Sequence, residues 1–330
     1  MTLSTPQLTT PTIITPLTWA TLPKTLRQTP PSNLTSHSIN QKRGRPLDSF
    51  LEGPIYIQSL NLLFLTDIPY GRIFTIDPTT AQWSLFLQYD GEPNGLAYHH
   101  ITKKILIADF KNGILELDPV TKNLRTIVSR YHGERLKGPN DLVVDSKGVV
   151  YFTDQGMTGL HDATGRVFRL ILEENNGEGV DGEVGGRLEM IISNGPSPNG
   201  LVLSRDESAL FVAMTRDNSI WYVPFMMDGS VQRVGRFASY YGIGGPDGMA
   251  IDSEGNILVA HSTLGRVFVH DRSGELKMVI KSEKGASTTN LTWGVGGSGS
   301  LDTLYIVESE MGEVLKMDWH CKGWLVKGLE

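Results

Sequence analysis

Carboxylate and amide side chains recur along the chain inside one short phrase. It runs Pro, then Asn or Asp, then Gly or Asp, then an aliphatic residue, at Pro93-Asn94-Gly95-Leu96, Pro139-Asn140-Asp141-Leu142, Pro198-Asn199-Gly200-Leu201 and Pro246-Asp247-Gly248-Met249. Two degenerate copies stand at Glu52-Gly53-Pro54 and Thr289-Asn290-Leu291. Hard divalent cations prefer carboxylate and carbonyl oxygens, so the phrase could supply a metal site if its copies meet in space.

The copies keep a regular spacing. With Glu52, Asn94, Asn140, Asn199, Asp247 and Asn290 as markers, successive gaps are 42, 46, 59, 48 and 43 residues. A second phrase, Gly-Arg-aliphatic-Phe or a shortened form of it, follows each marker after 18 to 25 residues. Six units of this length are typical of four-stranded propeller blades. We therefore predict an all-β fold, a six-bladed β-propeller with four antiparallel strands per blade, over residues 47–330.

The segments between the phrases are short and rich in branched and aromatic residues. Lys104–Phe110 and Asn256–His261 are examples, and Asp-rich turns such as 252–255 bound them. These features favour strands joined by tight hairpins. The Gly/Glu/Asn-rich stretch 173–186 is predicted to be a surface loop.

The inner strand of each blade lines the central channel, so equivalent positions of successive blades gather at one end of it. A single Pro-Asn-Gly phrase is an ordinary turn former, but six copies in phase favour a common site. We predict that Glu52, Asn140, Asn199 and Asp247 bind one divalent cation. Ca²⁺ is the first choice, with Mg²⁺, Mn²⁺ or Zn²⁺ as alternatives. Asn94 and Asn290 should lie at the same end.

The motifs resemble those of the regucalcin/gluconolactonase family over about residues 50 to 320. The resemblance rests on Glu52-Gly53-Pro54, on the three clear phrases at 139–142, 198–201 and 246–249, and on Tyr151-Phe152-Thr153-Asp154. It implies a six-bladed propeller with a divalent metal, commonly calcium, at the top of the channel, and many members hydrolyse lactones. It also implies Glu52, Asn199 and Asp247 as metal ligands, Asn140 as a ligand or substrate contact, and Asp141 as a proton-transfer group.

We predict that the chain is a metal-dependent lactonase, that is, a carboxylic ester hydrolase. The cation would polarise the lactone carbonyl, and Asp247 or Asp141 would take a proton from water. A carboxylate bound to the ion has a depressed pKa, which makes Asp141 a rival of Asp247 as the base. For the substrate we predict contacts with Asn140, Asn94 and His100, although a structural role for the His99–His100 pair is the simpler interpretation.

Two other functions fit the same residues. The site could serve a non-hydrolytic pathway enzyme, a cyclase, isomerase or C–C lyase, or the chain could be a non-catalytic calcium-binding propeller. A serine hydrolase is disfavoured because the sequence has no Gly-x-Ser-x-Gly elbow.

Composition limits the partners. The chain has 330 residues, a formal net charge of −6 and a single cysteine, Cys321. It therefore forms no intramolecular disulfide, and it carries no basic stripe for nucleic acid. No apolar run approaches the ~18 residues of a membrane span, and we find no secretory h-region, so we expect a cytoplasmic monomer or dimer that acts on a small molecule.

The start of the chain differs from the rest. Residues 1–46 hold seven of the 17 prolines, and proline cannot donate a hydrogen bond to a central strand. We predict an N-terminal extension that wraps the propeller or stays mobile, with a possible short helix or strand at Ile13–Leu22.

Overall fold

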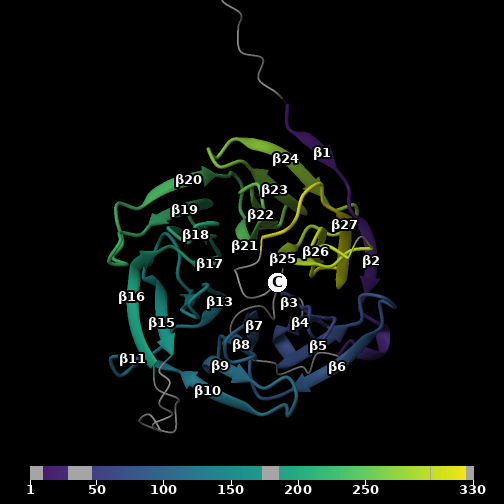
Figure 1. Ribbon diagram of the computed structural model, residues 1–330, viewed down its shortest axis with the longest axis horizontal. Helices are drawn as coiled ribbons and strands as arrows, with labels where there is room; N and C mark the ends of the chain where they lie inside the picture. Colours follow the sequence, from purple (N-terminus) through teal and green to yellow (C-terminus); the bar gives the residue numbers. More distant parts are fainter. Residues whose placement is uncertain (1–9, 29–46, 173–185, 298, 325–330) are drawn as a thin grey trace, which may run out of the picture.

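The computed structural model describes residues 10–28, 47–172, 186–297 and 299–324. Six antiparallel sheets stand as blades around a central channel (Figure 1). Their inner strands contact one another in sequence, and the last contacts the first, which closes the ring. The predicted six-bladed β-propeller is confirmed.

Each blade is a meander whose first strand is innermost. Blade 1 has β3 (Leu51–Ile57), β4 (Leu62–Asp67), β5 (Arg72–Ile76) and β6 (Trp83–Gln88); blade 2 has β7 (Pro93–His99), β8 (Lys104–Asp109), β9 (Gly113–Leu117) and β10 (Leu124–Val128); blade 3 has β13 (Pro139–Val144), β14 (Val150–Asp154), β15 (Gly165–Leu172) and β16 (Gly186–Gly195). Blade 4 has β17 (Pro198–Leu203), β18 (Ala209–Met214), β19 (Ser219–Pro224) and β20 (Gly235–Ser239); blade 5 has β21 (Gly245–Ile251), β22 (Ile257–Ser262), β23 (Arg266–His270) and β24 (Leu276–Lys281); blade 6 has β25 (Thr288–Gly294), β26 (Thr303–Glu308) and β27 (Glu313–Asp318). The second repeated phrase opens the third strand of each blade, as its spacing predicted.

The N-terminal segment completes the outer edges of the last two blades. β2 (Leu17–Thr21) pairs antiparallel with β27 as the fourth strand of blade 6, and β1 (Thr12–Ile14) pairs parallel with β24. Blade 6 thus takes its outer strand from the opposite end of the sequence, which ties the ring closed. Residues 1–9 and 29–46 of the predicted extension, and most of the predicted loop at 173–186, lie outside the described residues.

Small elements occupy the connections. A two-stranded ribbon, β11 (Arg130–Tyr131) with β12 (Glu134–Arg135), lies between blades 2 and 3. The described residues also form two 3₁₀ turns, η1 (Lys24–Leu26) and η2 (Ile68–Tyr70). No helix among the described residues has the length and apolar character needed to cross a membrane.

The hydrophobic core is divided among the blade interfaces. Six buried apolar clusters each combine residues of two neighbouring blades, and together they go once around the ring. Because burial of apolar area stabilises by about 25 cal/mol per Å², these interfaces hold the inner strands in fixed positions around the channel.

All inner strands run in the same direction along the channel. Each begins at what we call the marker end, where the repeated phrase lies, and ends in a hairpin turn at the opposite end. The loops between second and third strands, and the connections between blades, therefore also lie at the marker end.

The glycine of the repeated phrase lets adjacent inner strands approach closely. A Cβ on Gly200 would lie 2.2 Å from the Asp247 carbonyl oxygen, and one on Gly248 would lie 2.1 Å from Asn290 Oδ1. Asp141 and Asn290 take the place of this glycine in blades 3 and 6.

Strand register corrects one marker. Pro93 pairs with Asp109 and Pro139 with Asp154, and the residue of blade 6 in the same position relative to its partner strand is Thr288, opposite Glu308. The equivalent of Asn94 in blade 6 is therefore Thr289, and Asn290 corresponds to Asp141. The sequence phrase was shifted by one residue here because the copy lacks its proline.

Candidate metal centre and active site

A cavity of about 580 Å³ opens at the marker end of the channel. Five marker side chains from the inner strands of five blades line it: Glu52, Asn94, Asn140, Asn199 and Asp247. All five residues are buried. The predicted convergence of oxygen donors from distant parts of the sequence is thus present in the structure.

A β-bulge aims each of these side chains. In each of the five strands the pairing register shifts at the marker, for example between Pro139 and Leu142 and between Pro246 and Met249. A bulge bends the strand and turns a side chain away from the regular alternation. The repeated phrase therefore encodes an irregular strand start, and this start directs a polar side chain into the channel.

The amide side chains are poised to present oxygen atoms. Asn140 Nδ2 donates to Gln155 Oε1 at 2.9 Å, which leaves the amide oxygen of Asn140 for another partner. Gln155 in turn donates to Ser197 Oγ at 3.0 Å. The side chains of Asn94 and Asn199 form no hydrogen bond within the described part of the chain. Buried amides need partners, so a bound cation with oxygen ligands fits this set.

Glu52 brings a buried negative charge to the site. Its Oε2 accepts hydrogen bonds from the Gly53 backbone at 2.8 Å and from Asn290 Nδ2 at 3.0 Å. Burial raises the pKa of Glu52 to about 7. A cation beside this carboxylate would lower its pKa again, because an opposite charge favours the ionised form.

Asp141 lies farther from the marker end than Glu52 does. Asn290 Nδ2 is 3.4 Å from Asp141 Oδ2, so a single amide lies between Asp141 and Glu52. Burial, with a smaller contribution from the charge of Glu52, raises the pKa of Asp141 to about 8. Asp141 lines a second, mainly apolar cavity of about 160 Å³ rather than the larger one. This position differs from the expectation that Asp141 takes a proton directly from the attacking water.

The structure does not bring His100 to the site. The imidazole of His100 donates from Nε2 to the Ser146 carbonyl at 3.3 Å, and His99 donates in the same way to the Gly148 carbonyl at 3.0 Å. Both histidines lie where β7 ends, whereas Asn94 lies where β7 begins. The structure therefore places His100 away from the cavity at which the substrate contact was predicted, because the seven-residue strand β7 separates it from the marker end.

The mouth of the cavity contains residues that the sequence did not single out as site residues. Gln155 directly follows the Tyr151–Asp154 motif, which was the available signal. Arg216 lies on the loop between β18 and β19, and His161 lies on the loop between β14 and β15. Further side chains at the mouth are apolar or hydroxyl-bearing: Phe50, Phe110, Met157, Thr158, Ser197, Thr215, Ser262 and Thr263.

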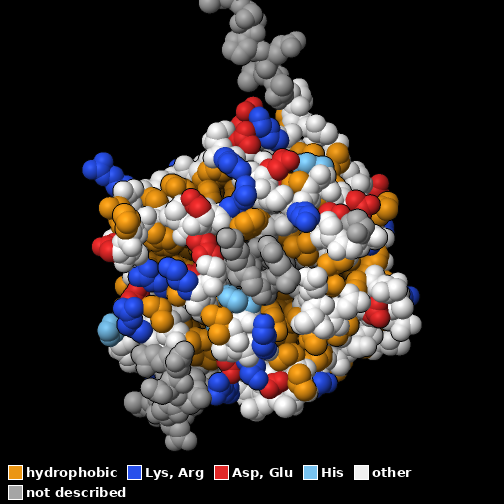
Figure 2. Space-filling view, in the orientation of Figure 1, with side chains coloured by type: hydrophobic (Ala, Val, Ile, Leu, Met, Phe, Trp, Pro, Cys, Tyr) orange, Lys and Arg blue, Asp and Glu red, His pale blue; other side chains and the backbone are white. Residues whose placement is uncertain are grey.

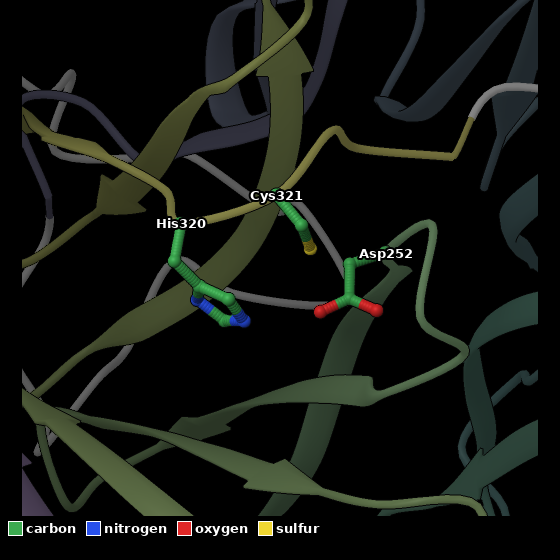
Figure 3. A group of neighbouring side chains, drawn as sticks. All are labelled: Asp252, His320 and Cys321. Atoms are coloured by element: carbon green, nitrogen blue, oxygen red, sulfur yellow. The ribbon is translucent and has the colours of Figure 1, made fainter.

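A second group of metal-ligating side chains lies at the opposite end. Figure 3 shows Asp252, His320 and Cys321 facing a common space, and one ligand atom of each lies within 4.8 Å of the others. The Asp252 carboxylate already accepts hydrogen bonds from two backbone N–H groups, the Asn256 amide and Trp319 Nε1. Burial raises the pKa of the Cys321 thiol, which disfavours the thiolate that a metal needs. We therefore place the candidate metal centre at the marker end.

Comparison with known proteins gives a consistent family. Residues 50–310 match the model of the SMP-30/Gluconolactonase/LRE-like region. A gluconolactonase of Zymomonas mobilis is 31% identical over 283 residues, which are 78% of this chain and 76% of that protein. The lactonase drp35 of Staphylococcus aureus is 30% identical over 221 residues, 64% of each chain.

Solved structures share the fold. A gluconolactonase of Xanthomonas campestris superposes with a TM-score of 0.67 at 24% identity, covering 82% of this chain and 86% of that one. A calcium-binding regucalcin of Agrobacterium tumefaciens superposes with a TM-score of 0.66 at 18% identity, covering 84% and 92%.

Proposed function

The chain belongs to the SMP-30/gluconolactonase/LRE-like family, and we propose that it is a lactone hydrolase that depends on one divalent cation. The observation that carries the proposal is the set of five buried oxygen-bearing side chains that converge on one cavity from five blades. Relatives named gluconolactonase and lactonase support the class of reaction.

The residues that would hold the cation are Glu52, Asn140, Asn199 and Asp247, with Asn94 beside them. Their donors are oxygen atoms throughout, which favours Ca²⁺ over the softer Zn²⁺. A divalent cation held there would polarise an ester carbonyl and stabilise the negative charge that develops on its oxygen. Two carboxylates would balance its charge.

The chain's own groups then have distinct tasks. Asp247 is the carboxylate we assign to accept a proton from the attacking water, because it lines the cavity and Asp141 does not. Asn94 and Asn140 would orient the substrate oxygens, and Gln155 would keep the Asn140 amide in the orientation that exposes its oxygen. Asp141 would act on Glu52 through Asn290 rather than on the substrate.

Chelation is the direct test. The chain is treated exhaustively with EDTA, assayed on a panel of five- and six-membered lactones, and assayed again after addition of Ca²⁺, Mg²⁺ or Mn²⁺. We expect loss of hydrolysis and its recovery with at least one ion, with a mass gain of one water in the product. Full activity after chelation would refute the cation requirement, and cation binding without turnover would favour a non-catalytic calcium-binding propeller. A product with unchanged mass would favour an isomerase.

A further inference from the structure

We propose that His161 and Arg216 form an anion-binding subsite at the mouth of the cavity, so that the preferred substrate is a lactone carrying a carboxylate or phosphate group. This inference rests on the proposed lactone hydrolysis for its substrate class, but the subsite itself stands on the geometry of the two side chains.

The two residues come from different blades and meet over one glycine. His161 lies on the β14–β15 loop of blade 3, and Arg216 on the β18–β19 loop of blade 4. A Cβ built on Gly159 would lie 3.2 Å from His161 Nδ1 and 3.5 Å from Arg216 Cγ. The side chains therefore lie side by side, and both line the cavity that holds the oxygen donors.

Arg216 is anchored to the strands that carry two predicted ligands. Its backbone N–H donates to the Pro196 carbonyl at 3.2 Å, just before β17 and Asn199. The preceding residue, Thr215, donates from Oγ1 to the Pro246 carbonyl at 2.8 Å, next to Asp247. The base of the Arg216 side chain is thus fixed close to the candidate metal centre, while the side chain itself is exposed at the rim.

The loop bearing His161 is fixed in a similar way. Gly159 and Asp162 exchange backbone hydrogen bonds of 3.0 Å, which places His161 in a tight turn. Thr158 accepts from the Ser197 N–H at 3.1 Å and donates to the Gln155 carbonyl at 2.6 Å. The turn is therefore attached to the same Gln155 that orients Asn140.

Neither basic side chain has an acidic partner among the described residues. The neighbouring Asp217 is used elsewhere, since it pairs with Arg236 at 2.8 Å and accepts from Ser219 Oγ at 2.5 Å. Guanidinium binds carboxylate and phosphate through paired hydrogen bonds, and imidazole can donate one in either protonation state. Arg216 is also the one Arg or Lys that lines the described cavity, so an anionic group on the substrate has a specific place to bind.

The experiment compares neutral and anionic lactones. D-Glucono-1,5-lactone is neutral, D-glucaro-1,4-lactone carries a carboxylate, and 6-phospho-D-glucono-1,5-lactone carries a phosphate. We expect the wild type to have a higher kcat/KM for one of the anionic lactones than for the neutral one. Arg216→Ala should lower kcat/KM for that substrate about tenfold or more while changing the neutral value less than about twofold. Arg216→Lys should recover part of the loss, and the preference should fall as salt is raised.

Two variants complete the design. His161→Ala should lower the preference for the anionic lactone less than Arg216→Ala does, because it removes a single hydrogen-bond donor. Arg233→Ala changes the net charge equally in the turn that follows β19, at the opposite end, and should leave the preference intact. Equal kcat/KM ratios in the wild type and Arg216→Ala, or a wild-type preference for the neutral lactone, would overturn the subsite.

Anion binding separates this inference from the proposed function. D-Glucarate or inorganic phosphate is titrated calorimetrically into the cation-loaded wild type and Arg216→Ala. Weaker binding by the variant supports the subsite even if no lactone is hydrolysed, which would then count against the hydrolase alone. Equal binding of both anions by the two proteins refutes the subsite whatever the activity.

Discussion

The two ends of the central channel use the same six strands for opposite purposes. At the marker end the strands begin with bulges, and these direct amide and carboxylate side chains toward a cavity of about 580 Å³. Toward the opposite end the same strands are regular, and their aliphatic residues line a cavity of only about 160 Å³. The site therefore depends on where the strands are irregular, while the regular parts supply packing.

The C-terminal segment strengthens this contrast. Trp324 lines the smaller cavity, its backbone N–H donates to the Ile251 carbonyl at 3.0 Å, and Arg205 stacks on its ring at 4.8 Å. On the face of the disc shown in Figure 2, acidic and basic side chains are interspersed among apolar ones. The described part of the C-terminal segment thus packs against the opposite end of the channel.

The largest expected effect comes from removing a charge at the marker end. Glu52→Gln keeps the size of the side chain but removes one of the two carboxylates that line the proposed cation site. We expect kcat/KM on the best lactone to fall at least about 100-fold and cation affinity to fall with it. Asp252→Asn is the matched control at the opposite end and should retain cation-dependent turnover if it folds, as judged by circular dichroism. Normal activity of Glu52→Gln would contradict the assignment of the cation site to the marker end.

A second effect tests the close approach of the strands. Gly200→Ala places a Cβ 2.2 Å from the Asp247 carbonyl oxygen, so the inner strand that carries Asn199 or the one that carries Asp247 must shift. We expect the free energy of unfolding to fall by about 2 kcal/mol or more in urea titrations. Gly235→Ala, where a Cβ would have no neighbour within 4 Å, is the control and should change stability by less than about 1 kcal/mol. Equal effects of both substitutions would contradict the packing argument.

The buried acid pair predicts a pH dependence with a definite sign. Since the pKa of Asp141 is raised to about 8 in the folded chain, the folded state binds more protons than the unfolded state between about pH 4 and pH 8. Stability of the cation-free protein should therefore fall as pH rises through this range. Asp141→Asn should reduce the fall between pH 5 and pH 8.5 by an amount on the order of 4 kcal/mol, measured by thermal unfolding in EDTA. Parallel profiles for the two proteins would show that Asp141 does not carry the effect.

The smallest effect is expected at the opposite end. Trp324→Ala removes a half-buried indole that covers the small cavity and its stacking with Arg205. We expect a loss of about 1 kcal/mol in stability, with kcat and cation affinity unchanged. A large loss of activity with normal stability would show that the two ends are coupled, and the separation of tasks would have to be abandoned.

The repeat made most of the fold predictable. Six copies of the phrase in phase predicted the six blades. The position of the phrase at the start of each inner strand predicted the convergence of five side chains: Glu52, Asn94, Asn140, Asn199 and Asp247. This worked because propeller symmetry converts spacing along the sequence into proximity in space. The outer strand β2 was less predictable, since its pairing with β27 depends on closing the ring across nearly the whole chain.

Other features depend on registers and loops that the repeat does not encode. The shift of one residue at Thr289 and Asn290 appears only in the strand pairing. Asp141 lines the smaller cavity because successive residues at the start of a strand point in different directions. Gln155 and Arg216 reach the larger cavity from loops whose paths follow from contacts between blades.

The most direct test of the central claim is an anomalous diffraction experiment on crystals soaked with Mn²⁺. We predict one strong peak at the marker end, within bonding distance of Glu52, Asn199 and Asp247, which is lost in the Glu52→Gln variant. A peak beside Asp252, His320 and Cys321 instead, with none near Glu52 and Asp247, would contradict the account.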